Sequence, residues 1–329
     1  AGRAVQAAAK AAGVSGVKVA TVVGDDVRGR AAELGLPDDA LFASAYLGAR
    51  PIVEALRQGA QIVSTGRVAD ASLFLAPLVH EFGWSWDDWD RLAAGVVVGH
   101  LLECSGQVTG GNYSGAWWEN AEPTRIGFPI AEVDDDGSAV ITKPEKTGGF
   151  VTFDTVREQL LYEVHDPSKY LNPDVVADFT SLAVTDEGND RVRVSGARGA
   201  PAPEMYKGLV CTPAGWAGEA RLAYAWPDAE AKARAAMAFI RTQAEASGVP
   251  VEEWHEEYFG AGAYGGPTVA RTTNPEPPEV IGRLAWRCAS AIKLLRRASA
   301  FSVPRNTMWQ GRLYAGLASS KRVTSHRRR

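Results

Sequence analysis

The chain has 329 residues, of which 46% are hydrophobic and 22% are charged, and its formal net charge is −4. This is the composition of a folded globular protein, and no segment approaches the roughly 18 consecutive apolar residues that a membrane-spanning helix needs. Its three cysteines, Cys104, Cys211 and Cys288, are too few and too scattered for a disulfide framework or a paired-cysteine metal site. We therefore expect a reducing, cytoplasmic setting and no membrane.

Charge is distributed unevenly along the chain. Residues 280–329 contain 12 of the 35 Lys and Arg residues and none of the 39 Asp and Glu residues, so the remainder is acidic. Binding to duplex nucleic acid depends on Lys and Arg side chains that neutralise phosphates. The acidic remainder thus argues against nucleic acid as the partner, and only the basic tail is a candidate for such contacts.

Short apolar runs alternate with helical patterns through the first half of the chain. The N-terminal residues predict a helix, and strands are predicted at residues 17–23, 61–64 and 139–143. Further helices are predicted at residues 50–58, 71–82, 87–104 and 153–164, and Ser85 with Asp88 predicts a capping box for the helix at 87–104. This alternation indicates an α/β fold with layered, parallel βαβ packing.

The pattern changes after Asp166. Strands are predicted at residues 190–199, 219–226, 254–260 and 279–287, with a helix at residues 227–246. The resulting β–α–β–β order favours a smaller α+β unit of ferredoxin-like type, with the boundary near residues 166–175. We predict an α/β core at residues 1–170, its α+β continuation at residues 171–288, and a basic tail at residues 289–329.

Polar or glycine-rich loops follow the three predicted strands of the core. They are Gly24-Asp25-Asp26, Thr65-Gly66-Arg67, and the segment from Lys143 to Thr147-Gly148-Gly149. In open α/β sheets, ligands bind beyond the carboxyl ends of the strands. Turn formation alone also favours Gly and Asp there, so each loop by itself is weak support for a site.

Arg67 precedes a helix that is predicted to start near Asp70. The free N–H groups of a helix start, together with a guanidinium, would bind a carboxylate or a phosphate, including one on coenzyme A. Alternatively, Asp70 caps the helix and Arg67 pairs with Asp70 or Asp25.

Lys143 with Thr147 offers a second anion-binding loop, although the spacing is not that of a P-loop. No GxGxxG follows a strand, so no nicotinamide cofactor is expected.

The stretch GHLLECSGQVTGG continues the helix predicted at residues 87–104. If that helix extends toward Gln107, then His100, Glu103, Cys104 and Gln107 lie on one face, which continues the apolar face of the first half. A polar end of this kind lines a cavity, or else His100 is a satisfied core histidine.

No HxH, HExxH or CxxC pattern adds a ligand, so no metal is expected. Cys104 is a nucleophile if His100 lowers its thiol pKa, and otherwise an inert part of the wall.

Four long segments of the chain carry a specific resemblance. They read STGRVADASLFLAPLVHEFGW, VGHLLECSGQVTGGNY, TKPEKTGGFVTFDTVREQLLYEVHDPSKYLNPDVVADF and RVRVSGARGAPAPEMYK. In this order they resemble the acyclic terpene utilisation family of AtuA type, over residues 17–287. The resemblance implies an α/β protein that acts in the bacterial catabolism of citronellol, geraniol and related branched acids, at or near the acyl-CoA stage. It also implies hydration or cleavage of an isohexenyl-substituted CoA thioester, as an expectation.

The chain departs from the family's pattern at both ends. Family members have a further N-terminal βα section with its own glycine-rich segment, so the resemblance implies an N-terminally truncated fold. They also continue into an additional domain after the segment PPEV, whereas this chain becomes arginine-rich and free of acidic residues. We expect residues 289–329 to be disordered or out of frame.

Together, the motifs and the resemblance favour an enzyme of lyase or hydratase type that acts on a branched acyl-CoA thioester. We assign general acid–base catalysis to His100, oriented by Glu103. Asp25 or Asp70 would be the opposing acid or base. Arg67 and Lys143 would hold anionic groups, and the helix end would donate hydrogen bonds to an enolate or carboxylate oxygen. The substrate-binding residues are then Thr65, Gly66, Arg67, Gln107, Thr109, Gly110, Gly111, Lys143 and Thr147.

The same residues fit two alternatives, a non-catalytic ligand-binding or scaffold subunit of the same pathway and an inactive fragment. In each case we expect a small-molecule partner, no cofactor beyond coenzyme A as part of the substrate, and a homo-oligomer. The site prediction requires His100, Arg67, Asp70 and Lys143 to converge on one cleft. A His100 buried among apolar side chains, away from the other three, would favour a structural role.

Overall fold

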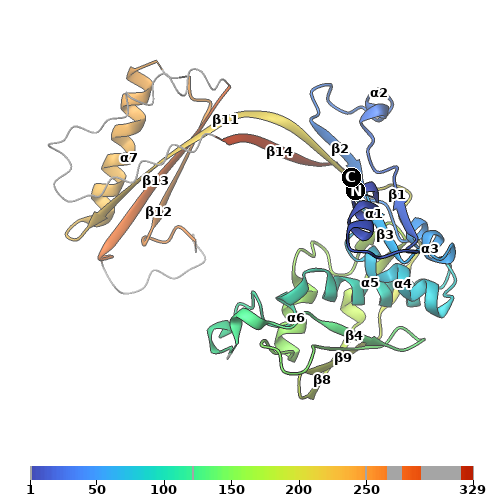
Figure 1. Ribbon diagram of the computed structural model, residues 1–329. Coiled ribbons are helices and arrows are strands. Elements are labelled where there is room, and N and C mark those ends of the chain that lie inside the picture. The colour runs from blue at the N-terminus through green and yellow to red at the C-terminus, as the bar shows by residue number, and fades with distance from the viewer. Residues whose placement is uncertain (1, 121, 249, 265–275, 290–319, 329) are drawn as a thin grey trace. The chain divides into compact units, whose positions relative to one another are not determined.

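The computed structural model describes residues 2–120, 122–248, 250–264, 276–289 and 320–328 (Figure 1). The chain forms two compact units. The first comprises residues 1–38, 42–210 and 326–329, and the second comprises residues 39–41 and 211–325. The main division lies at Val210 and Cys211, whereas the pattern placed it near residues 166–175, because the strands that follow residue 170 pack against a central helix of the first unit.

A parallel pair of strands opens the first unit. β1 (Val19–Val22) pairs with β3 (Ile62–Thr65), and helix α3 (Arg50–Arg57) lies between them in the chain. This βαβ element confirms part of the predicted parallel packing, while the layered sheet around it is not seen, since β1 and β3 form a sheet of two strands. The other early elements are α1 (Gly2–Ala11), α2 (Ala31–Leu34) and β2 (Phe42–Ala45).

Helices α4 (Ser72–Phe82) and α5 (Trp89–Glu103) form the centre of the first unit (Figure 1). Every residue from 92 to 101 in α5 is buried. The two helices approach closely at Gly99, where a Cβ atom would lie 2.4 Å from the Ala71 carbonyl oxygen. Helix α5 begins at Asp88, whose side chain accepts a hydrogen bond from the Arg91 amide. The predicted capping box is wrong in detail, because the Ser85 hydroxyl bonds to Asp87 instead.

Two antiparallel sheets surround these helices. The first has the order β4-β5-β9-β8 and the second the order β10-β7-β6. The strand predicted at residues 139–143 is β5, but it pairs antiparallel with β4 and β9, so its assignment to a parallel sheet is wrong. The strand predicted at residues 190–199 divides into β9 and β10, which belong to different sheets. The bounds are β4 (Ile130–Val133), β5 (Ala139–Thr142), α6 (Phe153–Leu161), β6 (Tyr170–Asn172), β7 (Val175–Asp178), β8 (Ala183–Gly188), β9 (Arg191–Ser195) and β10 (Arg198–Ala200).

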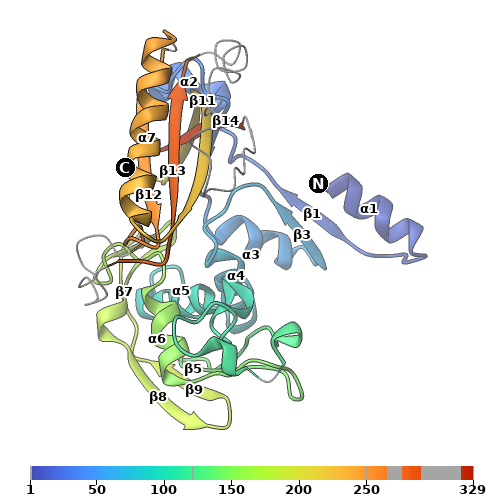
Figure 2. The ribbon, with the colours of Figure 1, turned by 90° about the vertical axis from the view of Figure 1, so that its left-hand side faces the viewer.

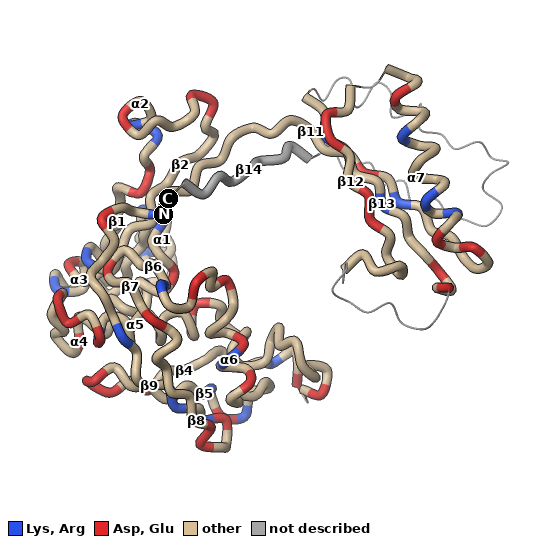
Figure 3. The backbone as a smooth tube through the Cα atoms, turned by 180° about the vertical axis from the view of Figure 1, so that it is seen from behind, with Lys and Arg blue, Asp and Glu red and all other residues tan. Residues whose placement is uncertain are grey.

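The second unit follows the predicted β–α–β–β order. Its elements are β11 (Gly208–Ala225), α7 (Ala229–Ala246), β12 (Glu253–Phe259) and β13 (Glu279–Cys288). Helix α7 covers one face of the sheet (Figure 2), and the absence of a side chain at Gly282 makes room for Met237. On the other face, Arg283 of β13 forms ion pairs with Glu219 and Glu257 of the flanking strands, where charges of both signs lie side by side (Figure 3).

The basic tail is in part a strand. Strand β14 (Ser320–Arg328) adjoins β11 at the edge of this sheet. The expectation that residues 289–329 are disordered or out of frame stays a prediction, and residues 320–328 form this strand in the structure. Residues 290–319 lie outside the described part of the chain.

Candidate functional site

The candidate site lies at the C-terminal end of α5. The helix ends at Glu103, and a 3-10 turn over Ser105–Gln107 follows. Ser105 adopts a left-handed backbone with φ of 53°, which breaks the helical repeat. The extension toward Gln107, on which the shared face of four residues depended, is thus not seen: His100 and Glu103 lie on the helix, and Cys104 follows its last residue.

His100 is a buried, hydrogen-bonded side chain. Its ring is 2% exposed, and its Nε2 lies 2.8 Å from the carbonyl oxygen of Gln159 in α6. The Gln159 side-chain Nε2 in turn donates to the His100 carbonyl at 2.9 Å. The rings of Tyr170 and Phe179 lie 5.4 and 5.5 Å away. Because a carbonyl only accepts, the imidazole carries its proton on Nε2.

Burial sets the protonation state of His100. Removal from water lowers the pKa of its imidazole, and the Gln159 carbonyl and the charge of Glu163 offset only part of that effect. The neutral form is therefore favoured at neutral pH. Tight packing and the hydrogen bond of Nε2 to the Gln159 carbonyl fix the orientation of the ring.

Glu103 and Cys104 form a pair at the helix end. The Cys104 Sγ donates to Glu103 Oε1 over 3.0 Å. Partial burial raises the pKa of the Glu103 carboxyl above its usual 4.5, although the thiol hydrogen bond opposes this. Burial, together with the neighbouring Glu103, raises the pKa of the Cys104 thiol to about 12. Cys104 thus remains a neutral thiol at physiological pH, whereas a nucleophilic cysteine needs a lowered pKa.

Two carboxyl groups from other segments act electrostatically on Glu103, and we call the three residues the acidic cluster: Asp70, Glu103 and Glu163. Asp70 precedes α4, Glu103 ends α5, and Glu163 follows α6. The charges of Asp70 and Glu163 both contribute to the raised pKa of Glu103. The charge of Glu163 is also the main cause of the raised pKa of its neighbour Tyr162.

Two further groups mark this region as a site. Gln159 is completely buried, and within the described residues its side-chain Oε1 has no hydrogen-bond partner. A buried acceptor without a donor is costly in a folded protein, so it calls for a specific explanation. Glu163 has a left-handed backbone with φ of 58°, an uncommon conformation for a residue other than glycine.

The Thr65-Gly66-Arg67 loop joins the acidic cluster through Asp70. The Arg67 amide donates to the Asp25 carboxylate over 2.7 Å, and a Cβ at Gly66 would overlap Asp25. The Arg67 guanidinium lies 4.0 Å from the Asp70 carboxylate. Asp70 does not cap α4, because the helix starts from Ala71 without a side-chain cap. Asp25, Thr65, Gly66, Arg67 and Asp70 thus form one neighbourhood, in which Asp25 accepts from the Arg67 amide and Asp70 lies beside the Arg67 guanidinium.

Aromatic and basic side chains border this loop. The Arg67 guanidinium lies 5.4 Å and the Lys207 ammonium 4.5 Å from the centre of the Tyr46 ring. Both are ordinary distances for a cation above an aromatic face. Tyr46 and Lys207 are thus additional neighbours of the predicted anion-binding residue.

The glycine-rich segment after α5 packs against a different loop. The Thr109 hydroxyl donates to the Gly127 carbonyl over 2.7 Å, and the Phe150 amide donates to the Thr109 carbonyl over 3.0 Å. The amides of Gly110 and Gly111 donate to the carbonyls of Gln107 and Gly106. The Thr109 hydroxyl and the Gly110 and Gly111 amides, three of the predicted oxyanion-hole donors, thus make their hydrogen bonds within the protein.

Lys143 is an internal ion-pair partner in the same neighbourhood. Its side chain is 8% exposed, and its Nζ lies 3.2 Å from Asp190 and 3.1 Å from the Thr147 carbonyl. The Thr147 hydroxyl bonds to the Pro144 carbonyl. The structure thus places Arg67 beside Asp70, buries His100 against Gln159, and ties Lys143 to Asp190.

Comparison with known proteins identifies the family. The profile of the acyclic terpene utilisation family protein AtuA matches residues 1–324. The chain belongs to this AtuA family. The match passes residue 287, where the resemblance of the motifs ended, and covers most of the segment expected to be out of frame. Searches of curated proteins and of solved structures found no match.

The site of this AtuA family member contains residues that the motifs did not single out. Gln159, Tyr162, Glu163 and Tyr170 come from the segments REQLLYEV and SKYLN. One signal was present, because Gln159 lies beside Val156 and Leu160 on the apolar face of its predicted helix, where a polar side chain needs a reason. Tyr162 and Glu163 are exposed in the turn after α6, Tyr170 is half-buried in β6, and no periodicity marks these three residues.

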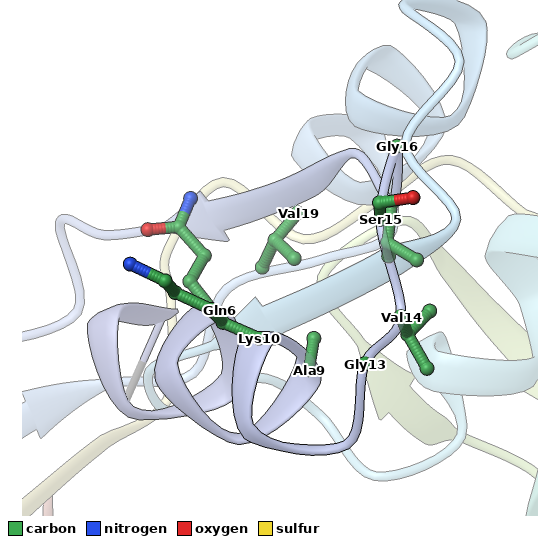
Figure 4. A pocket seen from close by; sticks show the side chains of 9 residues that line it. Gln6, Ala9, Lys10, Gly13, Val14, Ser15, Gly16 and Val19 are labelled. Atoms are coloured by element: carbon green, nitrogen blue, oxygen red, sulfur yellow. The ribbon is translucent and has the colours of Figure 1, made fainter.

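Other features of the described residues lie apart from this site. Among the described residues, no group of three or more His, Cys, Asp or Glu side chains is arranged to hold a metal ion. None of the described helices is long and apolar enough to cross a membrane. A cavity of about 380 Å³ lies beside α1, with Gln6, Ala9, Lys10 and Val19 around it (Figure 4). No residue of the predicted site lines this cavity.

Proposed function

We propose that this AtuA family member is a cytoplasmic enzyme of branched-acid catabolism, with hydratase or lyase chemistry on a branched acyl-CoA thioester. Coenzyme A would enter only as part of the substrate. The observation that supports the proposal is the half-buried Glu103, whose raised pKa brings its protonation closer to neutral pH beside two other carboxyl groups. Carboxyl groups whose pKa values are driven apart are the usual means of obtaining an acid and a base in one site.

Glu103 is the proton carrier in this proposal, and His100 positions it. His100 commits its Nε2 proton to the Gln159 carbonyl and is 2% exposed, so it has little access to a substrate. Glu103 is accessible and lies one helical turn further along α5. This reverses the roles assigned from the sequence, in which His100 transferred the proton and Glu103 oriented it.

Asp70 is the second acid–base group, and Arg67 is the anchor for the anionic part of the substrate. Arg67 lies 4.0 Å from Asp70, and its side chain is 41% exposed, so it is open to a ligand. Addition of water to a double bond needs an acid on one side and a base for the water proton on the other. Cleavage of a hydroxyacyl thioester needs the same two groups in reverse order. A homo-oligomer is part of this proposal as an expectation.

The replacement Glu103→Gln tests this assignment. We expect kcat for hydration of a branched enoyl-CoA thioester to fall by about 10²- to 10⁴-fold, the usual contribution of a positioned acid or base. The matched control is Glu81→Gln, an exposed carboxylate in the last turn of α4. Product formation is measured by mass spectrometry. An unchanged kcat in Glu103→Gln would remove Glu103 from the mechanism.

The alternative is a non-catalytic subunit that binds the same thioester. It is favoured by the internal hydrogen bonds of His100, Thr109 and the Gly110-Gly111 amides, which leave few donors for a transition state. Titration calorimetry separates the two proposals. Binding of the thioester without conversion, in the intact protein, would favour the binding subunit.

A further inference from the structure

A cavity of about 380 Å³ lies between helix α1 and strand β1, apart from the candidate site at the end of α5 (Figure 4). Its lining comes from three consecutive parts of the chain, which are α1, the loop at residues 13–17 and β1, and all three belong to the first unit. Cavities of about 300–1,000 Å³ are usual for small-molecule sites. None of its lining residues takes part in the proposed function, so the cavity needs an explanation of its own.

One side of the cavity carries a positive charge that has no internal partner. The side chains of Gln6 and Lys10 extend side by side from α1 (Figure 4), and neither makes a hydrogen bond or an ion pair with another described residue. None of the described residues that line the cavity is Asp or Glu, and the first acidic residue of the whole chain is Asp25. An ammonium group without a carboxylate partner attracts an anion.

The loop at residues 13–17 adds hydrogen-bond donors to the same cavity. Gly13 and Gly16 have left-handed backbones, with φ of 71° and 78°, so the chain turns sharply between the helix and the strand. The amides of Ser15 and Gly16 and the Ser15 hydroxyl make no hydrogen bond with any described residue. Successive free amides in a turn are a common backbone device for binding anions. The loop therefore supports the same ligand polarity as Lys10, from an independent set of atoms.

The remaining wall of the cavity is apolar. Val19 of β1 points toward α1, and Ala9 of α1 points toward β1 (Figure 4). Both residues are only half-buried, and no residue of α1 is fully buried, so the apolar surface between helix and strand is not filled by the protein. A ligand that covers this surface gains from hydrophobic burial. An inorganic anion such as phosphate would leave it exposed, whereas an anion with an alkyl chain would cover it.

We propose that this cavity is a second binding site, which takes a short-chain aliphatic carboxylate. The carboxylate group pairs with the Lys10 ammonium and accepts hydrogen bonds from the Gln6 amide and from the loop. The alkyl chain covers Ala9 and Val19. The site binds and does not catalyse, and it goes beyond the proposed function, because it shares no residue with the end of α5 or with the loop of Arg67.

An NMR titration of the full chain with hexanoate tests the site and its location together. At constant ionic strength, we expect hexanoate to shift the amide resonances of residues 13–17. It should bind at least about threefold more tightly than 1-hexanol, which lacks the charge, and about tenfold more tightly than acetate, which lacks the chain. Shifts that leave residues 13–17 unaffected would overturn the proposal. Equal affinities for hexanoate and 1-hexanol, or tighter binding of inorganic phosphate than of hexanoate, would overturn it as well.

Two matched substitutions in α1 then identify the cation. Lys10→Gln should weaken hexanoate binding about three- to fivefold, the effect of a partly exposed ion pair. Arg3→Gln removes the same charge from the same helix without touching the cavity lining and should leave the affinity unchanged. Because no residue of α1 is buried, both variants should keep the fold, which their amide spectra verify. Equal affinities in the two variants would overturn the proposal. If Lys10→Gln failed to fold, the comparison of hexanoate with 1-hexanol in the unaltered protein would still decide.

Discussion

The two halves of α5 differ in what burial does to their side chains. Residues 92–98 are apolar or glycine and belong to the core of the first unit. The end of the same helix carries His100, Glu103 and Cys104, whose pKa values all depart from their usual ranges with burial as the main cause. Burial of carbon stabilises the fold, whereas burial of an ionisable group changes its protonation. The candidate site is therefore built by extending a core helix beyond its apolar part.

Changes in the apolar half of α5 should affect the stability of the fold and leave the protonation of the helix end unchanged. Leu92 is fully buried, so Leu92→Ala leaves a cavity among α4, α5 and their neighbours. We expect the free energy of unfolding to fall by about 2–5 kcal/mol, measured by urea denaturation at neutral pH. The matched control is Leu73→Ala at an exposed position of α4, which should cost much less. A loss at Leu92 no larger than at Leu73 would contradict the assignment of this half to the core.

The apolar half was also the predictable half. The helices at residues 50–58, 71–82 and 87–104 were placed to within a few residues, because apolar side chains at helical spacing record which face is buried. The turn after the helix was not predicted, since a single left-handed residue, Ser105, redirects the chain and no periodicity announces it.

Pairing between distant segments limited the rest of the prediction. The apolar run of β5 fits a buried parallel strand as well as the antiparallel strand that it is, and only its partners β4 and β9 decide. Likewise, His100 and Glu103 were found from their own helix, but Gln159 and Glu163 reach them through packing of α6 on α5. A sequence pattern reports on one element and not on the element that meets it.

The reactivity of Cys104 tests the polar half directly. With a thiol pKa of about 12, little thiolate exists at pH 8. We expect its reaction with Ellman's reagent to be slower than that of a free thiol, whose pKa is about 8.5, by at least about a hundredfold. Cys104→Ser identifies its share of the signal. Glu103→Gln should accelerate the reaction, because the carboxyl group raises the pKa of Cys104 by hydrogen bonding and charge. A rate equal to that of free cysteine would show that the thiol is not held in this environment.

The smallest expected effect is a change in the pH dependence of stability. Burial lowers the pKa of His100 from 6.5, so the unfolded chain binds that proton more tightly and stability falls as the pH drops through 6.5 toward the folded value. Partial burial raises the pKa of Glu103 from 4.5, so stability falls as the pH rises from 4.5 through the folded value. Each group contributes a slope of at most about 1.4 kcal/mol per pH unit.

Urea denaturation between pH 4 and pH 8 separates the two groups by sign. Relative to the unaltered protein, His100→Gln should lose less stability toward acid, and Glu103→Gln should lose less toward alkali. The slopes stay informative even where a variant is less stable at every pH, because a constant loss does not alter the slope. Leu92→Ala supplies that case, since it removes no ionisable group and should lower the whole curve in parallel. If all three variants only lowered the curve, burial would act on both halves of α5 in the same way, and the end of the helix would be core rather than site.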